Sequence, residues 1–293
     1  MSGMALEQVL ATTGAPGGLH LLPYNDKESY LSMVAGALED IRSGRFYQIN
    51  LLRFFRVDGP LGRSELAKRI EHLGGPFSLL FQFPDYTVAS LSPERFIEIH
   101  PGESYAQIVT QPIKGTARRS EDPTQDRIAA TMLENSVKDN AELHIIVDLM
   151  RNDLNRICEK GTVAVSSPGK VASFKTIHHL VAEITGHLRA KLNFGEIIAS
   201  IMPGGSITGA PKVEVMAAIR EYEARPRGFF MGSGFYLDDS GHFDSSILIR
   251  TLVAESPDRF EYAAGSGIVV DSIPEAEYEE IGHKCRVVTD PLP

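Results

Sequence analysis

The sequence predicts an α+β fold built on large, mainly antiparallel sheets. Many short segments rich in β-branched and aromatic residues follow one another along the chain. Segments with helical spacing are mixed among them, without the strict alternation that a parallel sheet requires. At 293 residues and 43% hydrophobic, the chain is long enough to bury a large core. We expect residues 1–23 to be a lead-in and residues 24–293 to be one domain, since no linker divides them.

Apolar periodicity and turn residues assign most elements in order. The first helix is expected at residues 27–42, before Gly44. Further helices are expected at residues 64–73, 126–152, 194–201, 212–222 and 275–286. Strands are expected at residues 46–57, 77–83, 86–91, 96–100, 162–166, 170–173, 228–237, 243–254 and 260–270. Residues 176–189 are ambiguous, and we expect a helix that gives way to a strand.

Composition and charge exclude several classes of partner. The formal net charge of −9 argues against nucleic-acid binding, which needs a basic face. Apolar runs fall far short of the ~20 residues that span a membrane. Cys158 and Cys285 are far apart and lack metal-ligand spacing, so neither a disulfide framework nor a zinc motif is expected. The first residues lack the basic flank and apolar stretch of a secretory signal, and a cytoplasmic protein fits these observations.

A glycine-rich stretch, residues 202–212, is the first local signal. Its glycines allow a close backbone approach to a ligand, and Pro211 suits the start of the helix that follows. An anion site at that helix start is one interpretation, and an ordinary tight loop is the other. A phosphate-binding P-loop is excluded, because Ala210 and Pro211 precede Lys212 and no Lys-Ser/Thr pair follows.

Carboxylates at helical spacing are the second signal. Asp139 and Glu142 lie three residues apart, as do Glu277 and Glu280, with Lys284 one turn further on. Two such pairs facing each other would suit magnesium, although acidic residues on helices more often form a solvated face.

Four further places carry residue types suited to chemistry. Lys114 beside a glycine is either an exposed turn residue or a nucleophile. His178 and His179 are adjacent, and one of them is suited to acid–base work. Arg250 in a predicted strand needs a partner, either an ion pair or a substrate carboxylate. Residues 265–267 form a loop whose N–H groups would suit an anion.

Nine ordered segments together resemble the chorismate-utilising enzymes, a family that includes anthranilate, aminodeoxychorismate, isochorismate and salicylate synthases. They cover nearly all of the chain from residue 24. The segments are YQINLLRF (47–54), SPERF (92–96), PIKGT (112–116), KDNAELHIIVDLMRNDL (138–154), HHLV (178–181), PGGSITGAPK (203–212), MGSGFY (231–236), DSSILIRT (244–251) and AGSGIVVDSIPEAEYEEIGHK (264–284).

The resemblance implies a sandwich of two sheets with helices outside and the active site in the cleft between them. It implies that Mg²⁺ is held by Glu142 and Glu280, with Asp139 and Glu277 binding directly or through water. The metal would hold the ring carboxylate of chorismate and withdraw charge as the C4 hydroxyl leaves. Acid–base roles fall to His179 and Glu94. The implied substrate-binding residues are Thr208, Gly209, Tyr236, Arg250, Gly265, Gly267 and Lys284.

Lys114 points to one branch of the family. Anthranilate-, isochorismate- and salicylate-forming members typically have alanine at this position, whereas members that aminate chorismate at C4 typically have lysine, which attacks C2. Gln48 stands where the isochorismate- and salicylate-forming members carry a lysine that activates water. The resemblance thus implies formation of 4-amino-4-deoxychorismate for p-aminobenzoate and folate synthesis, with ammonia from a separate glutaminase subunit.

Two alternatives and two departures accompany this interpretation. The alternatives are an anthranilate-forming enzyme with the same site, and a relative that binds chorismate without converting it. Longer family members carry an N-terminal extension with a regulatory pocket, which we expect to be mostly absent here. Ala117 stands where an arginine is common, which leaves the role of that loop open.

Overall fold

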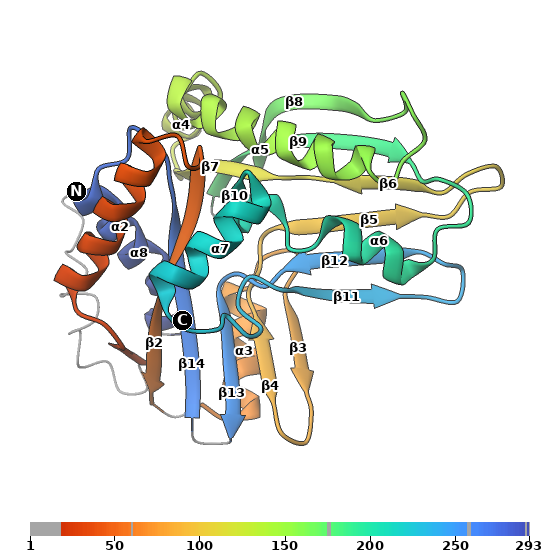
Figure 1. Ribbon diagram of the computed structural model, residues 1–293. Coiled ribbons are helices and arrows are strands. Elements are labelled where there is room, and N and C mark those ends of the chain that lie inside the picture. Colours follow the sequence, from red (N-terminus) through yellow and green to blue (C-terminus); the bar gives the residue numbers. More distant parts are fainter. Residues whose placement is uncertain (1–18, 60, 175–176, 257–258, 291, 293) are drawn as a thin grey trace. The chain divides into compact units, whose positions relative to one another are not determined.

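The computed structural model of the chain describes residues 19–59, 61–174, 177–256, 259–290 and 292. These residues form two compact units, each with its own sheet. The first unit contains residues up to Pro93, Ile207–Gly234 and Ile247 onward, and the second contains Glu94–Ser206 and Phe235–Ser246. Two antiparallel sheets with seven α-helices among the described residues confirm the predicted α+β class (Figure 1). The sandwich, the cleft and the single domain stay predictions.

The sheet of the first unit has the strand order β1-β2-β14-β13-β4-β3, with β10 paired to β2. Its long central pair joins β2 to β14 from Ile49↔Ile268 to Val57↔Phe260. The strands are β1 (His20–Pro23), β2 (Gln48–Asp58), β3 (Leu79–Gln82), β4 (Thr87–Ser90), β10 (Gly209–Ala210), β13 (Thr251–Ser256) and β14 (Arg259–Ile268); the helices are α2 (Lys27–Arg42), α3 (Arg63–Leu73), α7 (Lys212–Glu223) and α8 (Pro274–Thr289).

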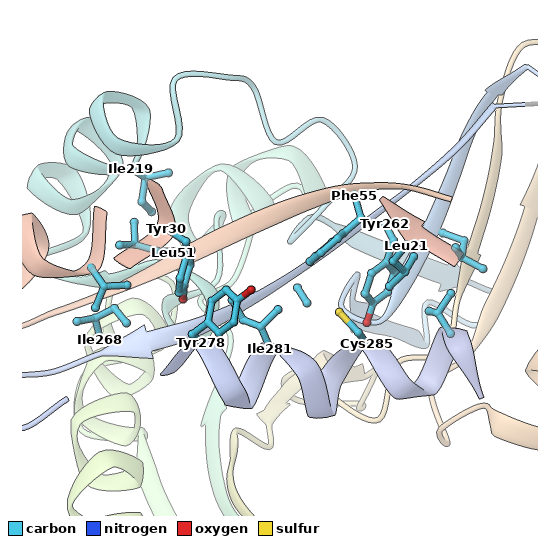
Figure 2. Packing of buried hydrophobic residues seen from close by; sticks show 14 of the residues in the cluster. Leu21, Tyr30, Leu51, Phe55, Ile219, Tyr262, Ile268, Tyr278, Ile281 and Cys285 are labelled. Carbon is cyan, nitrogen blue, oxygen red and sulfur yellow. The ribbon is translucent and has the colours of Figure 1, made fainter. Parts of the chain in front are cut away.

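Helix α8 supplies much of the apolar contact in the first unit. Tyr278, Ile281 and Cys285 lie on its buried side, spaced so that they share one face of the helix. They point toward β2 and β14, where Phe55 and Tyr262 lie (Figure 2). This packing fixes α8 against the β2–β14 pair and so positions the carboxylates on the same helix.

The sheet of the second unit has the strand order β11-β12-β5-β6-β9-β7, with β8 paired to β9. Its centre is the pairing of β9 with three strands, β6, β7 and β8. The strands are β5 (Arg95–His100), β6 (Gln107–Thr110), β7 (Ile113–Arg118), β8 (Ala164–Ser173), β9 (Ile177–His187), β11 (Ser233–Leu237) and β12 (Phe243–Ile247); the helices are α4 (Pro123–Glu134), α5 (Val137–Asn155) and α6 (Phe194–Ile201). A short 3₁₀ turn, Gly205–Ile207, follows α6.

Several expectations from the sequence were wrong. The strands expected at 162–166 and 170–173 are one strand, β8, and the strand expected at 228–237 begins only at Ser233. The single helix expected at 126–152 is two helices, because Asn135 ends α4 and the Ser136 side chain caps α5 by accepting a hydrogen bond from the Asp139 N–H. The helical start expected in 176–189 is instead strand: from Ile177 onward, the described part of that segment is β9, whose side chains alternate between faces. The strand expected at 243–254 is interrupted at Arg250, whose φ of 51° cannot continue a strand.

Both cysteines are buried thiols, and burial raises the pKa of Cys158 to about 11 and that of Cys285 to about 12. Within the described residues, no helix combines the length and apolar character needed to cross a membrane.

Candidate active site

Lys114 lies on β7 with its ammonium directed at α5. Its Nζ is 3.5 Å from Oε2 of Glu142, and both side chains are less than one-fifth exposed. The register of β7 against β9 shifts between Lys114 and Thr116, which places a bulge at Gly115. Gly115 has a φ of 70°, and a Cβ there would meet Asp139 Cγ at 2.9 Å. Glycine is therefore required for β7 to approach α5 closely enough for this ion pair.

Asp139 and Glu142 lie in the first two turns of α5. They share a face, as the sequence spacing predicts, and this face is turned toward β7. Glu142 receives a second cation, because Lys138 Nζ lies 3.8 Å from its Oε1, although the Lys138 side chain is 72% exposed. A carboxylate held between two lysines on a half-buried helix face attracts cations, a property that a metal ligand also needs.

The two adjacent histidines on β9 point to opposite faces of the strand. Nδ1 of His179 lies 3.0 Å from Oγ1 of Thr116 on β7, next to Gly115. His178 contacts Asp126 through Nε2 at 3.0 Å and Ser173 through Nδ1 at 2.8 Å. Alternation along the strand thus separates a histidine beside Thr116 from one that ties the strand to α4. The structure brings Lys114, Asp139 and Glu142 together in the second unit, with Nδ1 of His179 lying 3.3 Å from the carbonyl oxygen of Gly115 at the same bulge.

A second group lies in the first unit, between the end of β14 and α8. Lys284 Nζ donates to the carbonyl oxygen of Gly265 at 2.7 Å and forms an ion pair with Glu280 at 2.6 Å. Glu277 is buried, and both of its oxygens accept hydroxyl hydrogen bonds, one from Ser266 and one from Ser272. Glu277 is therefore a buried, hydrogen-bonded carboxylate, whereas the Glu280–Lys284 pair, with side chains 49% and 37% exposed, is tied to the end of β14 through Gly265.

The glycine-rich segment joins the sheet of the first unit. Thr208 is buried, and its carbonyl oxygen accepts from the Asn50 N–H at 2.7 Å. Gly209 pairs with Ile49, has a φ of 141°, and has the backbone of Gln48 where a Cβ would be. The end of the segment, Gly209–Ala210, is thus a short strand ahead of α7 rather than part of a free loop. Whether the start of α7 binds an anion stays a prediction.

The other expected site residues are distributed over both units. Arg250 lies between β12 and β13 in a left-handed conformation, and its carbonyl oxygen accepts from the Leu91 N–H at 3.0 Å. A non-glycine residue in this conformation costs about 1–3 kcal/mol and often marks a functional position. Gly267 pairs with Asn50 in β14. Glu94 is buried just before β5, and Tyr236 is exposed on β11.

Several residues that support these groups were not foreseen from the sequence. Thr116, Ser266 and Ser272 hold His179 and Glu277 through hydroxyls, and Arg227 donates to the carbonyl oxygens of Ile207 at 2.9 Å and Asn50 at 2.6 Å. Only Ser266 had a signal, because it lies inside the glycine-rich end of β14. A serine or threonine elsewhere in a sequence gives no indication of the carboxylate it meets after folding.

A chain with this pair of antiparallel sheets and these two polar groups falls within a known class. The family model of chorismate binding enzymes matches residues 4–290. The chain belongs to that family, as the nine segments indicated.

Individual members of the family are similar to this chain over most of its length. The chain is 42% identical over 253 residues to aminodeoxychorismate synthase component 1 of Salmonella typhimurium, covering 86% of this chain and 55% of that protein. It is 41% identical over 267 residues to the protein of the same name from Escherichia coli, covering 91% and 58%. The chain therefore spans somewhat over half the length of these curated relatives. Among solved structures, anthranilate synthase component I from Streptococcus pneumoniae superposes with a TM-score of 0.82 at 29% identity, covering 94% and 62%.

Proposed function

We propose that this chain aminates chorismate at C4 to give 4-amino-4-deoxychorismate, with Lys114 as a covalent nucleophile. The observation that supports this proposal most is the placement of Lys114, half-buried on β7 beside Glu142, with Asp139 and His179 around the same bulge. The relatives named aminodeoxychorismate synthase at 41% and 42% identity favour this function over anthranilate formation, for which the solved relative is 29% identical.

The reaction needs two substitutions. The neutral amine of Lys114 adds to C2, the ring double bonds shift, and the C4–O bond breaks; the hydroxyl leaves as water after it is protonated. Ammonia then adds to C4, the double bonds shift back, and the C2–N bond to Lys114 breaks. The net change is ammonia in and water out. We assign the proton transfers to His179 and Glu94, since a departing hydroxyl needs an acid and a lysine nucleophile needs a base.

Glu142 acts on Lys114 before the first step. Its carboxylate holds the ammonium in place at 3.5 Å, a separation that leaves the amine able to turn away once it loses its proton. Arg250, Lys284, Thr208, Gly209, Gly265, Gly267 and Tyr236 are assigned to binding the substrate's carboxylates and ring. A fixed cation such as Lys284 suits a carboxylate, because its position is already set by Gly265 and Glu280.

We also propose Mg²⁺ as the cofactor, held by Glu142 and Glu280 with Asp139 and Glu277. All four offer the carboxylate oxygens that magnesium prefers, and Glu142 and Glu280 already attract ammonium groups. When bound, the metal would polarise the substrate and stabilise charge on the leaving oxygen.

Ammonia would come from a separate glutaminase subunit, since the chain's two cysteines are buried thiols with raised pKa values and neither suits a glutaminase nucleophile. The same free thiols fit a reducing compartment, the cytoplasm. The product would feed p-aminobenzoate and folate synthesis.

Product identification with a pair of lysine variants tests this function. The protein is incubated with chorismate, Mg²⁺ and an ammonium salt, and the products are separated and identified by mass. The wild type should form 4-amino-4-deoxychorismate, and Lys114→Ala should not. Lys138→Ala is the matched control, because Lys138 also pairs with Glu142 but is exposed, and it should retain most of the activity.

Each other outcome has a definite meaning. Fluorescent anthranilate without any added lyase would assign the chain to the anthranilate-forming branch. Chorismate that is bound but never consumed, even with a glutaminase subunit present, would make the chain a non-catalytic relative. Full amination by Lys114→Ala would exclude the covalent step.

A further inference from the structure

The second unit carries a group of histidines and carboxylates at the end of its sheet, apart from the groups assigned to chorismate. Strands β5 and β12 pair antiparallel, with Ile99 opposite Phe243 and Glu98 opposite Asp244 (Figure 1). Because side chains alternate along a strand, Glu98 and His100 share a face with Asp244 and with His242, which directly precedes β12. The sequence carries this as two short mirrored patterns, Glu-Ile-His and His-Phe-Asp.

Three of these side chains converge on one point. Nε2 of His242 lies 3.1 Å from Oε1 of Glu98, and Nε2 of His100 lies 3.3 Å from its Oε2. One ligand atom from each of the three residues lies within 4.8 Å of the others. In a tetrahedral zinc site with bonds of about 2.0–2.2 Å, neighbouring ligand atoms are roughly 3.3 Å apart. The distance from His242 to Oε1 already matches that spacing. His100 lies 3.3 Å from the other oxygen, Oε2, and the 4.8 Å limit on all three ligand atoms means that His100 must move closer to Oε1 by at most about 1.5 Å.

The charges around the group favour a cation. Arg95 binds Asp244 through two hydrogen bonds, from Nε at 3.0 Å and from Nη2 at 2.9 Å, and its Nη1 also reaches Glu98 Oε2 at 2.6 Å. One guanidinium thus faces two carboxylates, which leaves one negative charge when both histidines are neutral. Arg95 occupies Oε2 of Glu98, so Oε1, beside His242, is the oxygen best placed for a metal.

His242 is held in position by the turn that precedes it. Asp238 accepts hydrogen bonds at Oδ1 from the N–H groups of Ser240 and His242, at 2.9 Å and 3.0 Å. Gly241 closes the turn with a φ of 85°. On the other strand, the Glu98 side chain is only 12% exposed. The ligand positions are therefore set by backbone elements, which lowers the cost of ordering them around an ion.

We propose that Glu98, His100 and His242 form a binding site for a borderline divalent metal of the Zn²⁺, Co²⁺ or Ni²⁺ class. Two imidazoles and one carboxylate are a ligand set for these metals and not for magnesium, which takes oxygen ligands. The exposed side of the group, where His100 is 46% exposed and His242 31%, leaves room for water as a further ligand. Each histidine would bind through Nε2, with the proton of the neutral ring on Nδ1.

Titration of the tag-free full chain with Zn²⁺ in isothermal calorimetry tests the proposal. One Zn²⁺ should bind per chain in the presence of excess Mg²⁺, and Co²⁺ should give the absorption of a four-coordinate site that Zn²⁺ displaces. His242→Ala and His100→Ala should each weaken binding by at least about tenfold, since each removes one of three ligands. His72→Ala is the control, because this histidine is exposed on α3 of the first unit.

Thermal melts separate loss of the site from loss of folding. Zn²⁺ should raise the melting temperature of the wild type and of His72→Ala but not that of His242→Ala. Glu98→Gln keeps a hydrogen-bond acceptor and should also lose tight binding. No Zn²⁺ binding to the wild type, or equal binding by the wild type and by folded His242→Ala, would overturn the proposal.

Discussion

The two polar groups assigned to chorismate chemistry both pair a lysine with glutamates, but their lysines are held to different degrees. In the first unit, Lys284 contacts both Glu280 and the carbonyl oxygen of Gly265, and Glu277 is fixed by two serine hydroxyls. In the second unit, Lys114 lies 3.5 Å from Glu142, at the outer range of an ion pair.

This difference in restraint suits the two roles proposed for these lysines, substrate binding for Lys284 and nucleophilic attack for Lys114. A lysine that binds a carboxylate loses nothing by being fixed, and a fixed position lowers the entropy cost of binding. A lysine that must lose its proton and form a bond needs weaker restraint and a neighbouring base. The comparison predicts that Lys114 depends on its amine chemistry, whereas Lys284 depends on its charge and place.

Exchange of each lysine for arginine is the strongest test of this comparison. Arginine keeps the positive charge but cannot become a neutral nucleophile. Lys114→Arg should therefore lower kcat by at least about 10³-fold, which is roughly 4 kcal/mol in activation free energy. Lys284→Arg should raise KM several-fold and retain most of kcat. Steady-state assays of amination with ammonium as the nitrogen donor measure both.

The opposite pattern would overturn the comparison. If Lys114→Arg retained amination while Lys284→Arg abolished it, Lys114 would be a binding residue. Equal melting temperatures for the two variants and the wild type are the control that both fold.

Substitution of the adjacent histidines of β9 should give the next largest effects, one on kcat and one on the free energy of unfolding. His179→Asn removes an acid–base group beside Thr116 and should lower kcat of the folded protein by about 10²-fold, although this histidine is buried too. His178→Asn breaks contacts with Asp126 and Ser173 in a buried position, and should destabilise the protein by about 1–3 kcal/mol. Steady-state kinetics measure the loss of kcat in each variant, and urea unfolding measures the loss of stability. Similar losses of kcat in the two variants would contradict the assignment.

Glu277 tests whether the polar group in the first unit is fixed by its hydrogen bonds. Glu277→Ala leaves the hydroxyls of Ser266 and Ser272 without their acceptor in a buried place, which should cost about 1–3 kcal/mol in unfolding free energy. Glu277→Gln retains an acceptor oxygen and should cost less. Urea unfolding of both variants measures the difference, and equal stability of Glu277→Ala and the wild type would show that this network adds nothing.

Much of this fold follows from apolar periodicity, and the exceptions have local causes. The helices at 27–42 and 194–201 were predicted with their observed bounds, because their apolar residues face a core and capping residues precede them. The long helix was wrong because Asn135 and Ser136 are tolerated inside helices as well as at their ends. The helical start proposed for 176–189 was wrong because its buried strand presents apolar residues on both faces.

The residue types of the candidate site could be predicted from the sequence, but the side chains and strand pairings that hold them in place could not. Carboxylate spacing placed Asp139 with Glu142 correctly on one face, since that depends on helix geometry alone. The approach of Lys114 to Glu142 depends on a bulge at Gly115, and the choice between His178 and His179 depends on strand direction. Both are set by pairing with residues more than sixty positions away, which no local pattern encodes.

Acid unfolding gives the smallest effect and tests the contacts that hold β9 in the second unit, next to the polar group of Lys114. Arg119 forms hydrogen bonds to Asp126, and together with the Ser120 N–H and His178 it holds the pKa of that carboxyl below its usual range. A folded-state pKa below the unfolded value stabilises the protein above about pH 4, and this contribution is lost as pH falls from there toward the folded-state pKa.

Asp126→Asn should therefore melt below the wild type at pH 7, and this gap in melting temperature should narrow between pH 5 and pH 3. Asp148→Asn is the control, because its exposed pair with Arg151 contributes little at any pH. A gap that stays constant down to pH 3 would mean that the ion pair to Arg119 does not stabilise α4 against β9.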